Sequence, residues 1–399
     1  MLRNITTTVR FIGVDDLDLD LFESQYIVPE GMSYNSYLIL DEKVAVLDTA
    51  DGRKGEAWKA NLVEALEGRT PDYLIVHHME PDHSALIAWM LEKYPSVTLV
   101  ASAAALKMLP QFFEGIALEG RTRAVKEGDT LDLGSHTLRF MMAPMVHWPE
   151  VMVSYEASEK LLFSADAFGR FGAMEKIAFW VSDDDDWACE ARRYYFNICG
   201  KYGVQVQNLL KKVAACDVAM ICPLHGPIIN ENLAYHVGLY NTWSSYGVET
   251  EGIFVAHASI HGGTAAAAEK LADILREKGC PKVSVADITR DDIAECVEDA
   301  FRYGKMVLAA SSYDAGVFTP MHDFLYRLQA KGYQQRTVGL VENGSWAPSA
   351  GRVMKEMLGA MKDVTIVEPL VTIRSRMHAE DLPKLEALAD AMLAAPAKQ

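Results

Sequence analysis

The chain of 399 residues has no Cys-x-x-Cys pair and no long apolar run. Its six cysteines are scattered, at Cys189, Cys199, Cys216, Cys222, Cys280 and Cys296. This spacing argues against an iron centre with four cysteine ligands and gives little support to a disulfide framework. No segment approaches the roughly 20 apolar residues of a membrane span, and the N-terminal segment lacks the apolar core of a signal peptide. We therefore expect a cytoplasmic protein that does not enter a membrane.

Positive charge is also scarce. Lysine and arginine total 38 against 55 aspartate and glutamate residues, which gives a formal net charge of −17. Nucleic acids and anionic membranes both need a positive protein face, so neither is an expected partner. Half of the residues are hydrophobic and 23% are charged, as in ordinary globular proteins. The length predicts two or three domains.

The most informative segment is His77-His78-Met79-Glu80-Pro81-Asp82-His83. The apolar run Tyr73–Val76 before it is typical of a buried strand, and Ser84–Leu91 after it of the start of a helix. The segment is therefore expected to be a short loop at a strand end, aiming its side chains at one point. Its expected metal ligands are His78, Glu80, Asp82 and His83. Two imidazoles and two carboxylates are too many for one structural zinc and suit a pair of harder ions such as iron or manganese.

Three more ligands are expected downstream, each after an apolar run, at His147, Asp166 and His225. The seven side chains can be divided into His78, Glu80 and His147 on one ion and Asp82, His83 and His225 on the other. Asp166 would then bridge the two ions, which leaves coordination positions open for a small molecule. His77 is out of register with this pattern and is interpreted as strand packing or as support for a ligand. Cys222 is interpreted as a small buried residue.

The succession of expected strands and helices changes near Thr250. Before it, strands are expected at 34–40, 44–47, 137–142 and 151–155, and helices near 54–66, 188–202 and 205–215. This mixture suits two sheets sandwiched between helices. From about Gly252 strands and helices alternate regularly. The expected strands are 253–256, 283–287, 306–310, 337–341 and 365–367, and the expected helices are 264–278, 290–302, 320–330, 350–361 and 379–393. Such alternation predicts a doubly wound parallel sheet, whose ligands lie beyond the carboxyl ends of the strands.

The sequence resembles the flavodiiron proteins over nearly its whole length. The resemblance rests on four motifs in order: His-x-Glu-x-Asp-His at 78–83, His-Trp-Pro at 147–149, Ala-Asp-x-Phe-Gly at 165–169 and Leu-His-Gly-Pro at 224–227. It implies a metallo-β-lactamase-like domain at residues 1–249 and a flavodoxin-like, FMN-binding domain at 250–399. Hydrolases of the metallo-β-lactamase superfamily carry His-x-His-x-Asp-His and bind zinc. Glu80 replaces the second histidine here, and a carboxylate favours iron.

The turn after the first strand of the second half resembles the flavodoxin phosphate loop. The match is at Ser259, Gly262 and Thr264, and the expected phosphate contacts also include His261 and Gly263. Two later loops are expected to contact the flavin ring. They contribute Ser311, Ser312, Tyr313 and Asp314 from one loop and Asn343, Gly344, Ser345 and Trp346 from the other. Here the chain departs from the usual family pattern, because the second ring loop lacks a Thr and Asn pair and Trp346 follows Gly-Ser.

The resemblance implies an enzyme that reduces dioxygen to water, nitric oxide to nitrous oxide, or both, at a di-iron centre fed by FMN. It also implies a head-to-tail homodimer or a dimer of dimers, and a separate rubredoxin-like electron donor. Trp148 and either Tyr194 or Tyr195 are expected near the metal ligands. Two other interpretations stay open, a zinc hydrolase fused to a flavodoxin-type electron carrier and an electron carrier whose first domain is inert.

Overall fold

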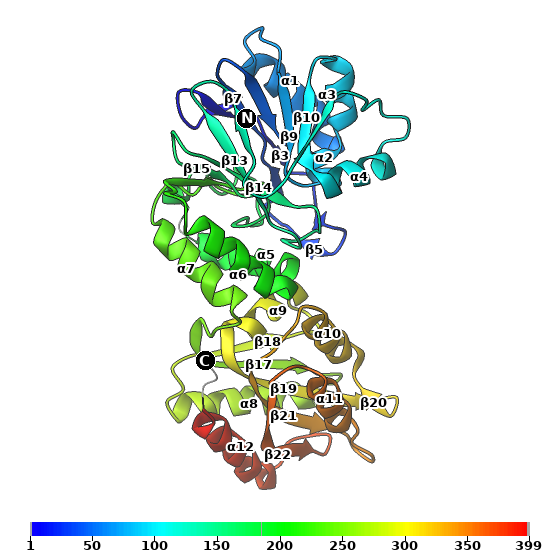
Figure 1. Cartoon of the computed structure of the whole chain (residues 1–399). Helices are drawn as coiled ribbons and strands as arrows, with labels where there is room; N and C mark the ends of the chain where they lie inside the picture. The colour runs from blue at the N-terminus through cyan, green and yellow to red at the C-terminus, as the bar shows by residue number, and fades with distance from the viewer. Residues whose placement is uncertain (1, 185, 397–399) are drawn as a thin grey trace. The chain divides into compact units, whose positions relative to one another are not determined.

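The structure is a computed structural model and describes residues 2–184 and 186–396. The chain divides into two compact units. The first comprises Met1–Tyr195 and Val204–Asn241, and the second comprises Phe196–Gly203 and Thr242–Gln399. The domain boundary expected between residues 249 and 250 stays a prediction, since these units also exchange the short segment Phe196–Gly203. Figure 1 colours the chain from its blue start to its red end.

The first unit contains a seven-stranded and a five-stranded sheet. The larger sheet has the order β1(Arg3–Asn4), β2(Val9–Phe11), β7(Tyr37–Leu40), β8(Val44–Leu47), β9(Tyr73–Val76), β10(Thr98–Ser102) and β11(Thr122–Val125). The smaller has the order β12(Thr130–Asp132), β13(Thr137–Met142), β14(Met152–Glu156), β15(Leu161–Phe163) and β16(Met220–Cys222). Side chains of both sheets, such as Leu47, Ile75, Phe140 and Phe163, form one buried apolar core. Burial of this core between two sheets is the main force that holds the unit together.

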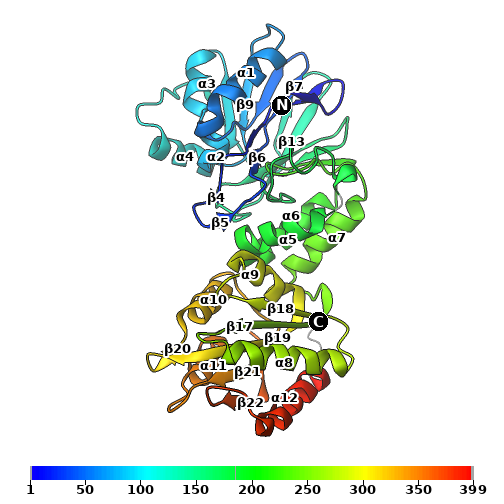
Figure 2. The same ribbon diagram turned by 180° about the vertical axis from the view of Figure 1, so that it is seen from behind.

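Helices accompany these sheets, as the sequence predicts. They are α1(Gly55–Ala65), α2(Pro81–Ser84), α3(Ile87–Lys93), α4(Ala103–Phe112), α5(Trp187–Ile198), α6(Gly203–Val213) and α7(Leu233–Ser244). In both views α1, α3 and α4 lie along the seven-stranded sheet (Figures 1 and 2). The expected sandwich of sheets between helices is therefore confirmed.

The expected single strand at 34–40 is wrong, because the chain turns at Asn35 and Ser36. Residues before the turn form β6(Met32–Tyr34), which pairs with β3(Val14–Asp16), whereas β7 joins the large sheet. The Asn35 amide donates to the carbonyl oxygens of Pro223 (2.8 Å) and Gly226 (2.9 Å). The turn therefore ties the start of the chain to the segment that carries His225. A further hairpin follows, of β4(Leu21–Phe22) and β5(Tyr26–Ile27).

The second unit is a twisted, mainly parallel sheet with helices on both faces, which confirms the expected flavodoxin-like architecture. The sheet has the order β18(Val283–Asp287), β17(Thr250–Ala258), β19(Tyr303–Tyr313), β21(Thr337–Asn343) and β22(Thr365–Ile373), and β20(Gly316–Val317) pairs with β19. Helices α8(Gly263–Glu277) and α12(Leu382–Ala394) pack together on one face. The other face is covered by α9(Ile293–Arg302), α10(Thr319–Ala330) and α11(Ala350–Gly359), as Figures 1 and 2 show.

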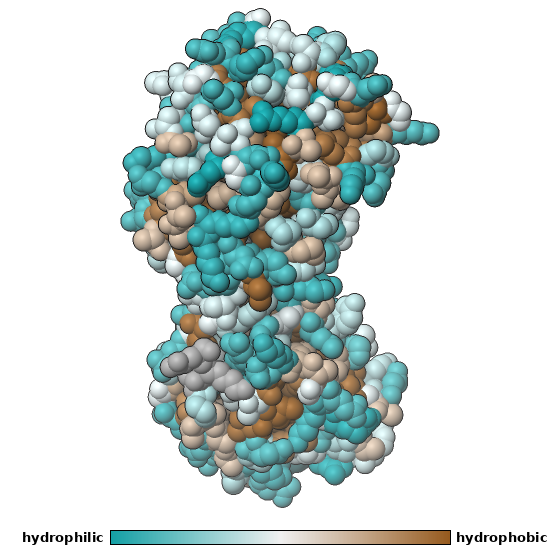
Figure 3. Space-filling view, in the orientation of Figure 1, coloured by the Kyte–Doolittle hydropathy of each residue, from teal (hydrophilic) through white to brown (hydrophobic). Residues whose placement is uncertain are grey.

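The surface agrees with the composition. The face shown in Figure 3 is largely teal and white, with brown apolar residues in separate groups. Among residues 2–184 and 186–396, every helix is too short or too polar to cross a bilayer.

Candidate functional site

Four of the predicted ligands meet at one point of the first unit. His78 follows β9, Glu80 precedes α2, His147 lies between β13 and β14, and Asp166 follows β15. The Nε2 atom of His78 lies 3.2 Å from Glu80 Oε2 and 3.2 Å from Asp166 Oδ2. The Nε2 atom of His147 lies 3.0 Å and 3.2 Å from the same two oxygens. We call these four side chains the first group.

Asp82, His83 and His225 form a second group. The two histidine Nε2 atoms are 3.0 Å apart, and each lies 3.4 Å from Asp82 Oδ2. They face Asp166 Oδ1 at 3.6 and 3.7 Å. Asp166 therefore turns one oxygen to each group, which is the arrangement needed for a bridging carboxylate. The structure brings all seven predicted side chains together and divides them as the sequence predicts, although Asp82 and His83 lie in the one-turn helix α2 and not in a loop.

This arrangement fits a pair of metal ions. First-row ions bind nitrogen and oxygen at about 2.0–2.2 Å, so neighbouring ligand atoms lie roughly 3.0–3.5 Å apart. The distances given above within each group agree with this range, and those from Asp166 to the second group are slightly longer. Neither carboxylate oxygen of Asp82 or Asp166 is hydrogen bonded, although both side chains are buried. A buried carboxylate without donors is costly unless a cation lies beside it. Imidazole and carboxylate without thiolate is the donor set of iron or manganese.

Two of the histidines are held in orientation by hydrogen bonds at Nδ1, the ring nitrogen that faces away from the ligand groups. His78 Nδ1 lies 2.8 Å from Glu150 Oε1, which also accepts from the backbone N–H of Met79 (2.9 Å). His225 Nδ1 lies 2.7 Å from the carbonyl oxygen of Ser33. A carbonyl only accepts, so Nδ1 of His225 carries the proton and its Nε2 lone pair faces the second group. The carboxylate of Glu150 favours the same tautomer for His78.

Glu150 was not among the predicted site residues, and it gives a test of this geometry. Glu150→Gln keeps the shape of the side chain but weakens the charge-assisted bond to His78. We expect the affinity for Fe²⁺ to fall about 10- to 100-fold, as is typical when a support of a metal-ligating histidine is lost. Competition with a chelator under anaerobic conditions measures this change. Glu159→Gln, remote in the same unit, is the control, and an equal loss in both variants would contradict the assignment.

In the metal-free centre, burial and the neighbouring charges shift the pKa values of several side chains in opposite directions. Burial lowers the pKa of His78, but the charge of Asp166 and the bond to Glu150 raise it well above the usual range. Burial also lowers the pKa of His147, but the neighbouring carboxylates of Asp166 and Glu80 outweigh this and raise it to about 9. Burial and the neighbouring His225 hold the pKa of His83 well below its ordinary value. Burial raises the pKa of Asp82 to about 6. Without a metal, protons on His78 and His147 balance the buried carboxylates.

Metal binding should therefore release protons. Neighbouring carboxylates raise the pKa of both His78 and His147 in the metal-free chain, so we expect both to carry a proton at pH 7. A metal ion needs their Nε2 lone pairs, so each must lose its proton on binding. We expect net proton release at pH 7 and an affinity that rises with pH up to about 9. Titration calorimetry of Mn²⁺ in two buffers of different ionisation enthalpy measures it. A binding enthalpy independent of buffer would contradict this account.

Aromatic rings enclose the histidines. The ring of Trp148 lies 5.2 Å from that of His78 and 6.3 Å from that of His147. Tyr194 lies 5.6 Å from His225, whereas Tyr195 packs on Tyr240 at 5.1 Å. Of the two expected tyrosines, Tyr194 is therefore the one beside a predicted ligand. Phe22 and Tyr34 also contact His225, at 5.4 and 6.1 Å.

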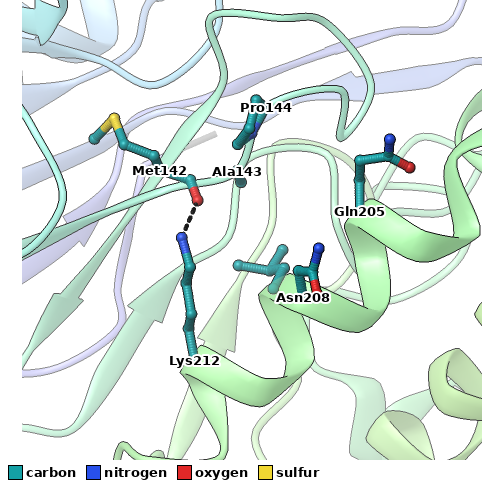
Figure 4. Close-up of a pocket in the computed structure, with 7 residues that line it drawn as sticks. Met142, Ala143, Pro144, Gln205, Asn208 and Lys212 are labelled. Atoms are coloured by element: carbon teal, nitrogen blue, oxygen red, sulfur yellow. Dashed lines mark hydrogen bonds between the residues drawn. The ribbon is translucent and has the colours of Figure 1, made fainter.

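Two other features of the first unit lie apart from these groups. His136, Glu156 and Glu159 also cluster, but hydroxyl and backbone groups such as Thr8 and Ser158 already bond them. A hollow of about 320 Å³ is shown in Figure 4. Its lining comprises Met142, Ala143, Pro144, Gln205, Asn208, Leu209 and Lys212. Lys212 there donates to Met142 O (2.7 Å) and pairs with Glu127 (2.5 Å), so its charge is already balanced.

The predicted flavin contacts meet at one edge of the second unit. The turn Ser259–Gly262 joins β17 to α8, and the later segments end β19 and β21. These strands are parallel, so their carboxyl ends share an edge. Gly262 has a φ of +83° and its N–H donates to Ser259 Oγ (3.0 Å). Thr264 Oγ1 lies 2.8 Å from Ser311 Oγ, which joins the first two segments.

The first of the two expected ring loops, at residues 311–314, is partly wrong. Ser311, Ser312 and Tyr313 continue β19, which forms a hairpin with β20 through Asp314. The side chains of Tyr313 and Trp346 are 48% and 89% exposed, so both offer aromatic faces to a ligand. A fourth segment was missed. Ser375, after β22, exchanges two hydrogen bonds with Asn343 at 2.9 and 3.0 Å. Its position after the fifth strand of the alternation was the available signal.

A substitution at Gly263 tests whether FMN binds at this edge of the sheet. A Cβ atom there would lie 2.2 Å from the carbonyl oxygen of Ser375, so Gly263→Ala must push the two segments apart. Overpacking costs about 1–3 kcal/mol, so we expect FMN affinity to fall roughly 10- to 100-fold. Gly359→Ala is the control, since nothing lies within 4 Å of the place that its methyl group would take and its helix favours alanine. Flavin fluorescence on titration distinguishes the two, and equal affinities would contradict the placement.

Comparison with known proteins agrees with these two units. Residues 32–226 match the family model described as ODP family beta lactamase. A putative diflavin flavoprotein A of Synechocystis is 30% identical over 85% of this chain, and an anaerobic nitric oxide reductase flavorubredoxin of Vibrio vulnificus is 28% identical over 80%. The chain spans only 57% and 65% of these two relatives.

Solved structures match over nearly the whole length. Rubredoxin oxygen:oxidoreductase of Desulfovibrio gigas has a TM-score of 0.91 at 24% identity, covering 99% of this chain and 100% of that one. The flavodiiron protein of Giardia intestinalis has a TM-score of 0.90 at 22% identity, covering 98% and 96%. The chain therefore shares the fold of these two proteins over nearly its whole length. This agrees with the two units described above, of which the first has a β-lactamase-like fold and the second a flavodoxin-like parallel sheet.

Proposed function

We propose that the chain is an oxidoreductase that reduces dioxygen to water, nitric oxide to nitrous oxide, or both, at two iron ions supplied with electrons by FMN. The observation that carries the proposal is the position of Asp166, with one oxygen toward each group of ligands. A pair of redox-active ions held in this way can pass two electrons to one small molecule. Both substrates stay in the proposal, because one relative is named a nitric oxide reductase and one structure an oxygen oxidoreductase.

The first unit would hold the metal pair. The four imidazoles are neutral when they bind, and the three carboxylates of Glu80, Asp82 and Asp166 offset most of the charge of two divalent ions. When bound, the ions supply electrons and open coordination positions for the oxidant. Glu150 and the Ser33 carbonyl fix the rings of His78 and His225. The ring of Trp148 packs edge-on against His78 and His147, which would help to hold both imidazoles in place.

The second unit would hold FMN. The N-terminus of α8, with Ser259, His261, Gly262, Gly263 and Thr264 before and within its first turn, suits a phosphate. Ser311, Ser312, Tyr313 and Asp314 would line one side of the ring, and Asn343, Gly344, Ser345 and Trp346 the other. FMN bound by these residues would supply one-electron transfer between the donor and the metal site.

The partners belong to the same proposal. We infer a separate rubredoxin-like donor, because a structure that this chain matches over nearly its whole length is named a rubredoxin oxygen:oxidoreductase. We also infer a head-to-tail homodimer or a dimer of dimers, as in the family, and a cytoplasmic location. The zinc-hydrolase alternative is not favoured, since a carboxylate stands at Glu80 and a flavodoxin-like unit follows.

The decisive experiment quantifies iron and flavin in the purified chain and then measures consumption of each gas by the anaerobically reduced protein. His83→Ala should lose iron and both activities while its flavin absorbance stays intact, because His83 belongs only to the second group. Zinc as the only metal, or reduced protein that consumes neither gas, would overturn the proposal.

A further inference from the structure

His77, the residue before the ligand His78, is buried and forms hydrogen bonds through both nitrogens of its ring. His77 is 2% exposed and its ring is bonded at both ends. Nδ1 lies 2.6 Å from Asp48 Oδ2, and Nε2 lies 2.8 Å from Ser154 Oγ. The backbone N–H of His77 donates to the other oxygen, Asp48 Oδ1, at 2.7 Å. The ring therefore points away from the ligand groups and into the sandwich.

The direction of each bond follows from the partners. A carboxylate only accepts, so Nδ1 of His77 donates to Asp48, and Nε2 accepts from the Ser154 hydroxyl. The order serine, histidine, aspartate is that of a hydrolytic triad. Ser154 is 0% exposed, however, so no substrate can reach its hydroxyl. A nucleophilic role is excluded, and the arrangement must act on the protein itself.

The three residues connect the two sheets. Asp48 follows β8 and His77 follows β9, both in the seven-stranded sheet, whereas Ser154 lies in β14 of the five-stranded sheet. The carbonyl of His77 also accepts from the N–H of Met152 in β14 (3.1 Å). The residue after His77 is the ligand His78, and the residue two before Met152 is its support, Glu150. The connection thus lies where the two sheets together orient His78.

We propose that His77 is a positioning residue for the metal centre: its two-ended ring sets the distance between the sheets at His78 and Glu150. This inference rests on the proposed metal centre. A metal site needs its ligands held to within about 0.5 Å, and two buried hydrogen bonds in series provide a stiffer spacer than apolar packing. Loss of either bond should therefore weaken metal binding although His77 never touches the metal.

The two ends of the ring can be tested separately. His77→Asn places an amide N–H near the position of Nδ1 and keeps the bond to Asp48. Ser154→Ala removes only the bond at Nε2 and needs no change in the ligand segment. His77→Ala removes both. We expect Fe²⁺ affinity to fall about tenfold in H77N and in S154A, and about a hundredfold in H77A.

The chain offers a matched control in His136. It is 3% exposed, its Nδ1 lies 2.7 Å from Asp41 Oδ2, and its Nε2 lies 3.0 Å from Thr8 Oγ1. It thus has the same pair of partners, a carboxylate and a hydroxyl, but belongs to neither ligand group. His136→Ala should cost comparable thermal stability and leave Fe²⁺ affinity within about twofold of the parent chain.

The experiment is an anaerobic Fe²⁺ titration of the full chain against a competing chelator, with the melting temperature of each metal-free variant. Weaker binding in H77A, H77N and S154A but not in H136A supports the inference. Unchanged affinity in H77A, or losses that simply follow the fall in melting temperature in all variants, overturns it. If H77A does not fold, S154A and H77N decide alone. Failure of the parent chain to bind Fe²⁺ would instead overturn the proposed function, and the same series with Zn²⁺ would then test the positioning.

Discussion

Replacement of Asp166 by asparagine is expected to abolish binding of both metal ions. Each carboxylate oxygen faces one ligand group, at 3.2 Å from His78 and 3.6 Å from His83, so one substitution affects both. Asparagine offers only one oxygen and no charge. We expect iron per chain to fall from about two to near zero at Fe²⁺ concentrations that saturate the parent chain, an effect beyond the 10- to 100-fold loss of a supporting residue.

The same substitution should also destabilise the metal-free chain. The neighbouring charges of His78 and His147 lower the pKa of Asp166 against the effect of burial, so its carboxylate is ionised beside protonated histidines. Removing one partner of a buried ion pair costs roughly 3–5 kcal/mol. Elemental analysis and thermal unfolding measure the two effects.

Asp16→Asn is the control for Asp166. Asp16 is also fully buried and paired, with Arg53 and Lys54, but it belongs to neither ligand group. It should lose stability and keep both ions. Retention of a full complement of iron by D166N would show that Asp166 does not bridge the pair.

Replacement of Glu80 by histidine is expected to reverse the choice of metal. The variant carries His-x-His-x-Asp-His, the pattern of the zinc hydrolases of the metallo-β-lactamase superfamily described above. Glu80 Oε2 lies 3.2 Å from His78 Nε2 and 3.0 Å from His147 Nε2, so an imidazole there completes a three-nitrogen face. Such a face suits zinc, whereas the carboxylate suits iron. We expect the ratio of zinc to iron taken up from an equimolar mixture to rise at least tenfold.

Glu80→Gln separates charge from metal preference. The amide keeps the length of the side chain and removes its charge, so both ions should bind more weakly with little change in their ratio. The ratio of zinc to iron in the parent chain, E80H and E80Q is measured by elemental analysis after loading from the equimolar mixture. An unchanged ratio in E80H would mean that the first group does not select the metal through residue 80.

Most of the metal-binding residues could be predicted from the sequence, because histidine, aspartate and glutamate are distinctive residue types and here they follow the ends of predicted strands. His78, Glu80, Asp82 and His83 stand together after β9 of the seven-stranded sheet. Asp166 and His225 follow β15 and β16, which are neighbouring parallel strands of the five-stranded sheet. What supports the ligands is harder to predict. The hydrogen-bond partner of His225 is the backbone carbonyl of Ser33. Every residue has such a carbonyl, so the sequence does not indicate which one accepts this bond.

Other misses have similar causes. The turn at Asn35 depends on carbonyls of Pro223 and Gly226, nearly 190 residues away in sequence, which no local pattern reveals. Ser375 joins the flavin edge only because β22 lies beside β21. The extension of β19 to Tyr313 follows from its pairing with β20, a two-residue strand too short to give a periodic signal. Long-range pairing, and not propensity, decided each of these cases.

The two ligand groups also differ in when the ribosome supplies them. His78, Glu80, His147 and Asp166 have all been synthesised once residue 166 is added, whereas the second group lacks His225 until β16 and its following turn have emerged. That turn is then tied by Asn35 back to one of the earliest parts of the chain. The second group therefore cannot be complete before residue 225 has been added, so its site is the last of the two to receive all its side chains during synthesis.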